Sequence, residues 1–307
     1  MHDYLDGLFD RFWNYQEHYF PDFHGKFSNL GRNDQGPPVF RPESGDCNVV
    51  APRGLHEEVL RTIAASRRHR WFRSMRSSQA LTQSVFGTLI VMDKLNLLSG
   101  VRTENGEPAF FGSAPDRDLC HLEHRCLSLG ERKDRETQSD VYFDGALPVS
   151  VECKFSEDRF GECSQTQLKP DARNFAEDFC DGSYRMQAGR KERCSLSAKG
   201  IRYWQKIPMA FQWREEADHP VCPIAAPYQL VRNVLASGDG HALLVYDERN
   251  PAFRAEGECF LQWSEVHDNL LDRSRLRRCS WQRILKEMER DADLSEFVAE
   301  LRDKYGF

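Results

Sequence analysis

"QSDVYFDGALPVSVECKF", residues 138–155, contains two β-rich runs joined by an Asp-Gly turn signal. The runs "SDVYF" and "PVSVECKF" are rich in β-branched and aromatic residues, and with the turn they predict a β-hairpin. Alternate residues of a strand share a face, so Glu152 and Lys154 point one way while the valines point the other. Charged side chains are seldom buried unless they are paired or bound to a metal. The hairpin therefore either lies at a solvated edge or holds a site.

The elements around the hairpin follow an informative order. A helix is predicted from 77 to 99, with a serine cap and a glycine stop, and a strand is predicted over 120–129. The segment 156–222 is polar and cysteine-bearing and shows no strand pattern. A helical pattern at 226–237 and a strand pattern at 240–248 follow it. The sequence therefore predicts helix, three strands, insertion, helix and strand, which is an α/β fold.

The outer segments are predicted to be additions to this core. Residues 1–20 carry apolar side chains at helical spacing, and 20–54 is rich in Gly, Pro, Asn and Asp, which predicts an irregular connection. A helix is predicted over 55–75, and two helices over 280–307. We expect three parts: an N-terminal helical and irregular extension (1–76), a core (77–250) with an insertion (156–222), and a C-terminal helical extension (251–307).

Composition narrows the class of protein. The 307 residues are 40% hydrophobic with a net charge of −6, which suits a soluble globular protein. The longest apolar run, 85–92, is shorter than the roughly 20 residues of a membrane span. The first residues lack the basic start and apolar stretch of a signal peptide. We therefore expect a cytoplasmic protein with no membrane partner, whose ten cysteines are reduced.

The hairpin brings two carboxylates and an ammonium group to one patch. Asp140 begins the first strand and faces back toward Glu152. Mg²⁺ prefers oxygen ligands and usually keeps waters beside one or two carboxylates, so Asp140, Glu152 and the backbone carbonyl of Cys153 are candidate ligands for Mg²⁺ or Mn²⁺. Lys154 would orient a water or stabilise negative charge in a transition state. Such a patch suits hydrolysis of a phosphodiester bond.

Asp140, eleven residues and then Glu152-Cys153-Lys154 resembles the PD-(D/E)XK signature of the restriction-endonuclease-like nuclease superfamily. The predicted element order also resembles its αβββαβ core, a mixed sheet flanked by helices, although Ser139 replaces the proline of the signature. "SSQAL", "YQLVRN" and "YW" are similar to a bacterial branch of the superfamily. The resemblance implies a Mg²⁺-dependent nuclease that acts on nucleic acid, and on DNA in particular.

The resemblance also implies further site residues. Several superfamily members carry an extra acid from the first helix or first strand, and Glu123 is the candidate here, with an ordinary surface acid as the alternative. In the recombination-nuclease branch a Gln and a Tyr from the second core helix approach the site. Gln229 and Tyr228 occupy the matching helix, although the spacing between them differs from that of the branch.

A basic run, "SRRHRWFRSMR", precedes the first core helix. Arginines near aromatic side chains suit phosphate contacts and base stacking, and an acidic nuclease needs a local positive surface. The alternative is a solvated helix face with Trp71 and Phe72 turned to the core. The candidate nucleic-acid-binding residues are Arg67, Arg68, Arg70, Arg73 and Arg76.

Four cysteines lie in the insertion or at its end: Cys163, Cys180, Cys194 and Cys222. Four thiolates can bind zinc or an iron–sulfur cluster. The chain has no CxxC pair, so buried thiols without a metal are the alternative.

Together these features predict a metal-dependent nuclease of restriction, phage defence, repair or mobile-element processing. No GxxxxGK[ST] motif occurs, so any motor would be a separate protein. The expected partner is nucleic acid, and a second copy of the chain or defence or repair proteins remain open as further partners. One alternative is a non-catalytic nucleic-acid-binding or assembly module on the same fold, and another is a structural metalloprotein built on the cysteines.

Overall fold

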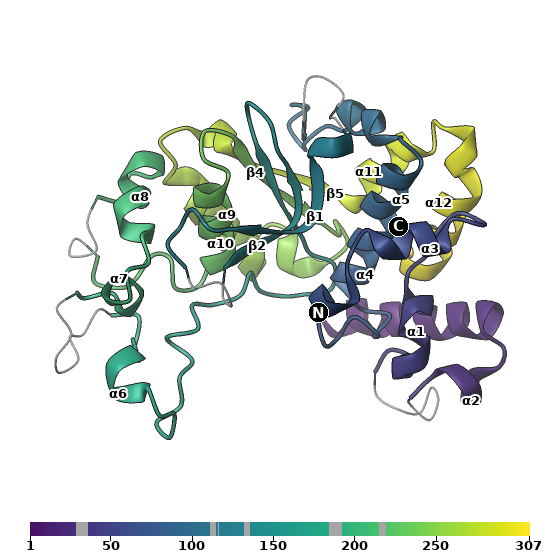
Figure 1. Cartoon of the computed structure of the whole chain (residues 1–307), viewed down its shortest axis with the longest axis horizontal. Coiled ribbons are helices and arrows are strands. Elements are labelled where there is room, and N and C mark those ends of the chain that lie inside the picture. The colour runs from purple at the N-terminus through teal and green to yellow at the C-terminus, as the bar shows by residue number, and fades with distance from the viewer. Residues whose placement is uncertain (29–35, 111–114, 116, 132–135, 184–191, 215–218) are drawn as a thin grey trace.

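The computed structural model describes residues 1–28, 36–110, 115, 117–131, 136–183, 192–214 and 219–307. Within this part of the chain, one mixed sheet of five strands forms the centre of the molecule (Figure 1). Its strands lie side by side in chain order: β1 (Cys120–Cys126), β2 (Thr137–Phe143), β3 (Val149–Cys153), β4 (His241–Tyr246) and β5 (Leu276–Ser280). β2 pairs antiparallel with both β1 and β3, whereas β4 pairs parallel with both β3 and β5. The predicted hairpin is confirmed as β2 and β3.

Helices cover both faces of this sheet (Figure 1). Val151 and Val245 belong to an apolar cluster that includes side chains of the first set of helices, whereas Leu244 and Tyr246 belong to a second cluster with the other set. Because both faces are covered, every residue of β3 and of β4 is buried. The first set is α1 (His2–Tyr19), α4 (Ser78–Thr82), α5 (Thr88–Val91), α11 (Trp281–Met288) and α12 (Ser295–Tyr305); the second is α8 (Tyr203–Ala210), α9 (Tyr228–Ala236) and α10 (Glu258–Asp268).

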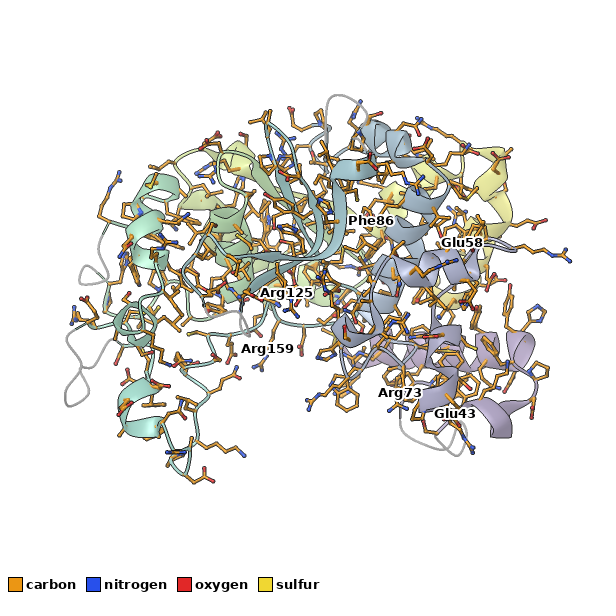
Figure 2. All side chains as sticks on the ribbon, in the orientation of Figure 1. Glu43, Glu58, Arg73, Phe86, Arg125 and Arg159 are labelled. Atoms are coloured by element: carbon orange, nitrogen blue, oxygen red, sulfur yellow. The ribbon has the colours of Figure 1, made fainter. Side chains whose placement is uncertain are left out.

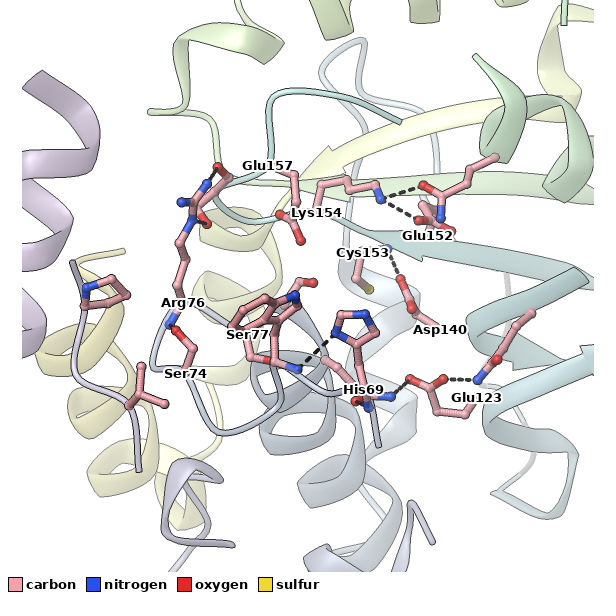
Figure 3. Close-up of a pocket in the computed structure, with 18 residues that line it drawn as sticks. His69, Ser74, Arg76, Ser77, Glu123, Asp140, Glu152, Cys153, Lys154 and Glu157 are labelled. Carbon is pink, nitrogen blue, oxygen red and sulfur yellow. Dashed lines mark hydrogen bonds and ion pairs between the residues drawn. The ribbon is translucent and has the colours of Figure 1, made fainter. Parts of the chain in front are cut away.

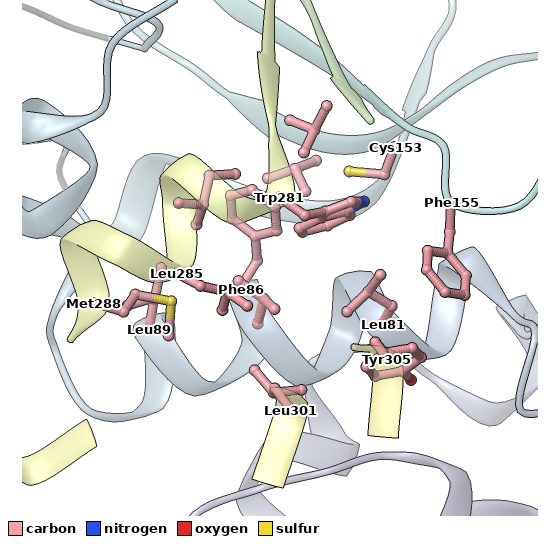
Figure 4. Close-up of a cluster of buried hydrophobic side chains, with 14 of the residues drawn as sticks. Leu81, Phe86, Leu89, Cys153, Phe155, Trp281, Leu285, Met288, Leu301 and Tyr305 are labelled. Atoms are coloured by element: carbon pink, nitrogen blue, oxygen red, sulfur yellow. The ribbon is translucent and has the colours of Figure 1, made fainter. Parts of the chain in front are cut away.

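Trp281 packs in the first apolar cluster, with Cys153 and Phe86 among its members (Figure 4). Phe86 is fully buried, whereas Glu58 and Arg159 are exposed (Figure 2). The indole N–H of Trp281 donates a hydrogen bond to the backbone carbonyl of Lys154 over 2.9 Å. The apolar core therefore holds the end of the strand that carries the charged residues.

The first core helix begins where the sequence predicts. The side chain of Ser77 accepts a hydrogen bond from the backbone N–H of Ala80 over 3.2 Å, which caps α4. The helix then widens into a π-helical turn (Gln83–Gly87), continues as α5 and is followed by a 3-10 turn (Leu95–Gly100). A single regular helix was predicted over this range. The amide of Gln83 donates to backbone carbonyls of the preceding segment, so the π turn accommodates a buried polar side chain.

The helix predicted over 55–75 is wrong beyond its first turns. α3 (His56–Arg61) ends early, and a 3-10 turn (Ala65–Arg67) and irregular backbone follow it. The side-chain amide of Asn48 donates to the backbone carbonyls of Phe72 (2.6 Å) and Ser74 (2.7 Å). These carbonyls are used in tertiary contacts rather than in a helix, a competition that the helical spacing of the sequence does not show.

Among its described residues, the segment 156–222 carries short helices, which the sequence analysis did not predict, and no strand. α6 (Phe175–Asp178), α7 (Ser195–Ala198) and α8 lie at the opposite end of the molecule from α1 and α12 (Figure 1). Residues 184–191 and 215–218 of the predicted insertion lie outside the described part.

The C-terminal segment contributes the strand β5 besides its helices, and the prediction of helices alone missed it. In β5 two arginines, Arg277 and Arg278, separate Leu276 from Cys279, so the sequence shows no alternation of apolar and polar residues there. The remaining short helix is α2 (Phe23–Lys26). Among the helices described, none has both the length and the apolar character needed to cross a bilayer.

Candidate active site

The charged pair at the end of β3 is buried and held by α9. Nζ of Lys154 lies 2.8 Å from Oε1 of Glu152 and donates to Oε1 of Gln229 over 2.8 Å. Nδ2 of Asn233 donates to Oε2 of Glu152 over 2.9 Å. Glu152 and Lys154 are 5% and 7% exposed. Because Gln229 and Asn233 are four residues apart, they lie on one face of α9 and orient both members of the pair.

The side chain of Asp140 is hydrogen-bonded to the backbone at the same end of β3. Oδ2 of Asp140 accepts a hydrogen bond from the backbone N–H of Cys153 over 2.6 Å. The backbone N–H of Lys154 donates to the carbonyl of Val245 over 2.7 Å. The side chain of Cys153 is buried in the core, as its position on the apolar face predicts. The three residues of the Glu-Cys-Lys signature are thus fixed by β2, β4 and the core.

Glu123 lies next to this group on β1. Leu122 and His124 of β1 pair with Val141 and Ser139 of β2. Glu123 lies between the first two residues and Asp140 between the other two, so Glu123 and Asp140 are neighbours across the strands. Its φ of 53° is in the left-handed region, which is strained for a residue with a side chain and is common at functional sites. Nε2 of Gln79 donates to Oε1 of Glu123 over 2.6 Å, and Nε2 of Gln138 donates to Oε2. Glu123 is buried, so the alternative of an ordinary surface acid is wrong.

These side chains line one pocket of about 690 Å³ (Figure 3). The structure therefore brings together the six residues predicted to be catalytic or to bind the metal: Glu123, Asp140, Glu152, Cys153, Lys154 and Gln229. Tyr228 does not line the pocket, and its hydroxyl lies 3.0 Å from that of Tyr203. A pocket of this size accommodates a small-molecule-sized group such as one nucleotide.

Burial and mutual repulsion raise the pKa values of two carboxyl groups in the pocket. Burial is the largest cause for Asp140, and nearby carboxylates add to it, so its pKa lies well above its ordinary value. Burial also raises the pKa of Glu123 to about 7, against hydrogen bonds from the two glutamines. Burial lowers the pKa of Lys154, but attraction to the carboxylates, Glu152 first, outweighs this and raises it. Lys154 therefore stays charged at neutral pH.

The chemistry of the donors fits a divalent cation. Among the described residues, no three His, Cys, Asp or Glu side chains are already arranged as a metal site. Mg²⁺ does not need such a set, because one or two carboxylates and several waters usually hold it. Asp140 and Glu152 supply hard oxygen donors. A bound cation would also relieve the repulsion that raises the pKa of Asp140.

The basic run divides into packing and pocket residues. The side chain of Arg68 pairs with Asp46 and stacks on Phe72, and Nη1 of Arg73 donates to the carbonyl of Phe40 over 2.9 Å. Arg76 lines the pocket and donates to the side chain and the carbonyl of Ser156.

The two aromatic residues of the run point in different directions. Phe72 is buried, whereas Trp71 lines the pocket and is 58% exposed. The guanidinium of Arg70 lies 5.0 Å from the centre of the Trp71 ring, and both Arg67 and Arg70 are exposed. The exposed indole and the arginines beside it therefore form one rim of the pocket.

Several pocket residues were missed in the sequence. His69 accepts a hydrogen bond at Nδ1 from the backbone N–H of Trp71, and its own backbone N–H donates to Gln79. Glu157 adds a further carboxylate beside Lys154 (Figure 3). Asn233, which donates to Glu152, was also missed. Its position four residues after Gln229 is the one local signal that could have revealed it, because residues four apart lie on the same face of a helix. The others are brought to the pocket by long-range packing.

The four cysteines of the insertion line a separate small cavity, with no carboxylate of the pocket among its lining residues. No disulfide joins any of the ten cysteines in the structure. The two sites are therefore distinct in their donors and in their position.

A mixed α/β sheet with an Asp, Glu-x-Lys set at the end of its central hairpin defines a restriction-endonuclease-like protein. A family model described as "Restriction Endonuclease associating with ARP" matches residues 26–306, so the chain belongs to this family. The predicted superfamily resemblance and fold class are thereby confirmed. No curated protein and no solved structure matches the chain. Membership indicates a nuclease, whose substrate is nucleic acid.

Proposed function

We propose that the protein is a Mg²⁺-dependent nuclease that hydrolyses phosphodiester bonds of DNA. The observation that carries the proposal is the buried Lys154–Glu152 pair, which shares one pocket with Asp140. A buried ion pair contributes little to folding stability, because the cost of desolvating the two charges offsets their attraction. A role in binding or catalysis is therefore the better explanation for this pair. Asp140 and Glu152 hold the cation in this proposal, and the carbonyl of Cys153 is the further ligand.

Each residue has a role that follows from its contacts. The bound cation supplies Lewis-acid chemistry that polarises the phosphate. Lys154, which stays charged, stabilises the negative charge that develops on the phosphate oxygens as a water oxygen bonds to phosphorus and one ester bond breaks. Gln229 and Asn233 hold Lys154 and Glu152 in place, which preserves the alignment of the reacting groups.

Glu123 serves as a third carboxyl group, which exchanges a proton near neutral pH. In the metal-free site burial raises its pKa to about 7, close to the pH at which an acid or base is most effective, and a bound cation favours the ionised form that accepts a proton. Gln79 and Gln138 fix its orientation on β1. It can therefore take up the proton that the attacking water loses.

The rim of the pocket supplies the nucleic-acid contacts. Arg67 and Arg70 are exposed and suited to phosphates, and Arg76 lines the pocket itself. Arg68 and Arg73 support this surface through their packing contacts. Trp71 presents an exposed indole on which a base can stack. The family description names an association with ARP. We propose that the nuclease works together with partner proteins of a defence or repair system.

The test is cleavage of plasmid, linear and single-stranded DNA and of RNA with Mg²⁺, Mn²⁺ or EDTA. Wild type is compared with Glu152→Gln and Lys154→Met, and with Glu58→Gln as an exposed control. Cutting that needs the metal and is lost in both pocket variants supports the proposal, and the substrate preference decides between DNA and RNA. Metal-dependent binding of nucleic acid without cutting would favour a non-catalytic module on the same fold.

A further inference from the structure

Four cysteine side chains from different segments meet at one cavity, separate from the charged pocket. Cys163, Cys180, Cys194 and Cys222 all line it, and the space inside is about 10 Å³. That is room for about one water-sized sphere. Four of ten thiols therefore gather around a space that suits a single ion and is too small for a multi-iron cluster.

Backbone hydrogen bonds at three of the cysteines hold together the segments around the cavity. The N–H of Cys163 donates to the carbonyl of Ala225 (2.8 Å), the N–H of Cys180 to Gln165 (3.2 Å) and the N–H of Cys222 to Gly182 (2.6 Å). Each bond joins segments that are far apart in the sequence. The regular structure described within 156–222 consists of the short helices α6, α7 and α8. Between residues 163 and 200, the buried apolar side chains in the described part of the chain are three of these cysteines and Leu196, so this stretch has little apolar core of its own and needs a further constraint.

Two hydroxyl-bearing side chains line the cavity beside the cysteines. The backbone N–H and the hydroxyl of Thr166, which also lines the cavity, donate to the backbone carbonyl of Cys163 over 3.0 Å and 2.8 Å. The hydroxyl of Ser195, which also lines the cavity, is buried and has no hydrogen-bond partner among the described residues.

We propose that Cys163, Cys180, Cys194 and Cys222 bind one structural zinc ion. Four thiolates are a tetrahedral zinc ligand set, with Zn–S distances of about 2.3 Å. In the described part of the chain, the side chains are not grouped tightly enough to hold an ion as they stand. Zinc binding therefore turns the four side chains inward, and the thiol protons are released to solvent as the ion binds.

The zinc ion also steadies the approach to the active site. Cys222, Ile224 and Ala225 line the cavity directly before α9 begins at Tyr228. α9 carries Gln229 and Asn233, which hold the Lys154–Glu152 pair. The metal thus anchors the N-terminal end of the helix that positions the charged pair.

The first measurement is the metal content of the purified full-length protein by mass spectrometry. We expect about one zinc per chain in wild type, and less than about 0.2 in Cys163→Ser and in Cys222→Ser. Cys120→Ser is the matched control for the buried Cys163, because the two have nearly equal exposure, and Cys47→Ser is the control for the partly exposed Cys222. Both controls should keep about one zinc.

A second measurement does not depend on the folding of variants. Mercurial titration of wild-type thiols should release the zinc, which a metal-binding dye detects, as the cavity thiols react. Wild type with no zinc, or zinc retained in both Cys163→Ser and Cys222→Ser, would overturn the proposal. Iron in place of zinc, with visible absorption, would overturn the assignment of the metal. Nuclease activity is not a readout here, so the outcome is independent of the proposed function.

Discussion

Asn233 and Glu152 lie 81 positions apart in the sequence, yet Nδ2 of Asn233 donates to Oε2 of Glu152 over 2.9 Å. This contact fixes a carboxylate whose other oxygen pairs with Lys154. Replacing Asn233 by alanine should lower the cleavage rate by about 10- to 100-fold, because partners of ligand side chains typically have effects of this size. The rate is measured on plasmid DNA in Mg²⁺. Nucleic-acid binding should stay close to that of wild type.

Asn96→Ala serves as the control for this substitution, because Asn96 is exposed and away from the pocket. It should leave the rate unchanged. Equal loss of rate in both variants would show that the effect of Asn233→Ala is not specific to the pocket.

The buried ion pair predicts a stability effect that does not require activity. Lys154→Met leaves Glu152 buried without its cation and should cost about 3–5 kcal/mol of unfolding free energy. Adding Glu152→Gln removes the uncompensated charge, so the double variant should be more stable than Lys154→Met alone. Urea unfolding of the four proteins measures the coupling.

The exposed pair Arg61–Glu58, 3.2 Å apart, is the matched control. Its coupling should stay below about 1 kcal/mol, because exposed pairs contribute little. A double variant no more stable than Lys154→Met would argue against a buried, charged pair in this pocket.

The raised pKa of Glu123 predicts how stability depends on pH in EDTA. Burial raises the pKa of Glu123 from 4.5 to about 7. A carboxyl group with a raised pKa favours the folded state while it is protonated, and this contribution is lost as pH rises from about 4.5 through 7. Wild type should therefore lose on the order of 2–3 kcal/mol more than Glu123→Gln between pH 5 and pH 8.

Urea unfolding at several pH values compares the slopes of the two proteins rather than their absolute stabilities. Added Mg²⁺ should reduce the loss in wild type at pH 8, because the ion favours the ionised carboxylates. Parallel slopes for wild type and Glu123→Gln would contradict a raised pKa at this residue. Glu58→Gln, which changes an exposed acid, should follow wild type.

Trp71 predicts a stacking contribution to substrate binding. Trp71→Ala should weaken binding of single-stranded DNA by about 1–3 kcal/mol, whereas Trp71→Phe should retain most of the affinity because a ring remains. Fluorescence anisotropy in EDTA measures binding without cleavage. Arg70→Ala should weaken binding less at high salt than at low salt, because its contact is electrostatic. Unchanged affinity of Trp71→Ala would mean that the substrate does not pass over this rim.

The sequence predicted the part of the site that depends on local spacing. Asp140, Glu152 and Lys154 lie on one hairpin, so the turn and the alternation of strand faces were enough to bring them together. Glu123 and Gln229 required the resemblance to a known fold, because they reach the pocket from other elements. The strands β1, β2 and β3 and the helix–strand unit after the insertion were predictable for the same reason as the hairpin residues, since each is a continuous local pattern.

The rest depended on long-range contacts that no local pattern records. Gln79, Gln138 and Asn233 are ordinary polar residues in the sequence and gain roles only through Glu123 and Glu152. The irregular backbone after α3 and the strand β5 likewise follow from tertiary pairing, with Asn48 and with β4. Local propensity is overridden wherever such contacts use the backbone groups.

We propose that Asp140 and Glu152 hold the cation used for cleavage. The most direct measurement is the initial rate of plasmid cleavage as a function of Mg²⁺ concentration, for wild type, Asp140→Asn and the exposed control Glu58→Gln. We predict saturable cleavage by wild type and by the control, none in EDTA, and a rate lowered at least about 100-fold in Asp140→Asn. Cleavage by Asp140→Asn at the wild-type rate and with the same Mg²⁺ dependence would contradict the account.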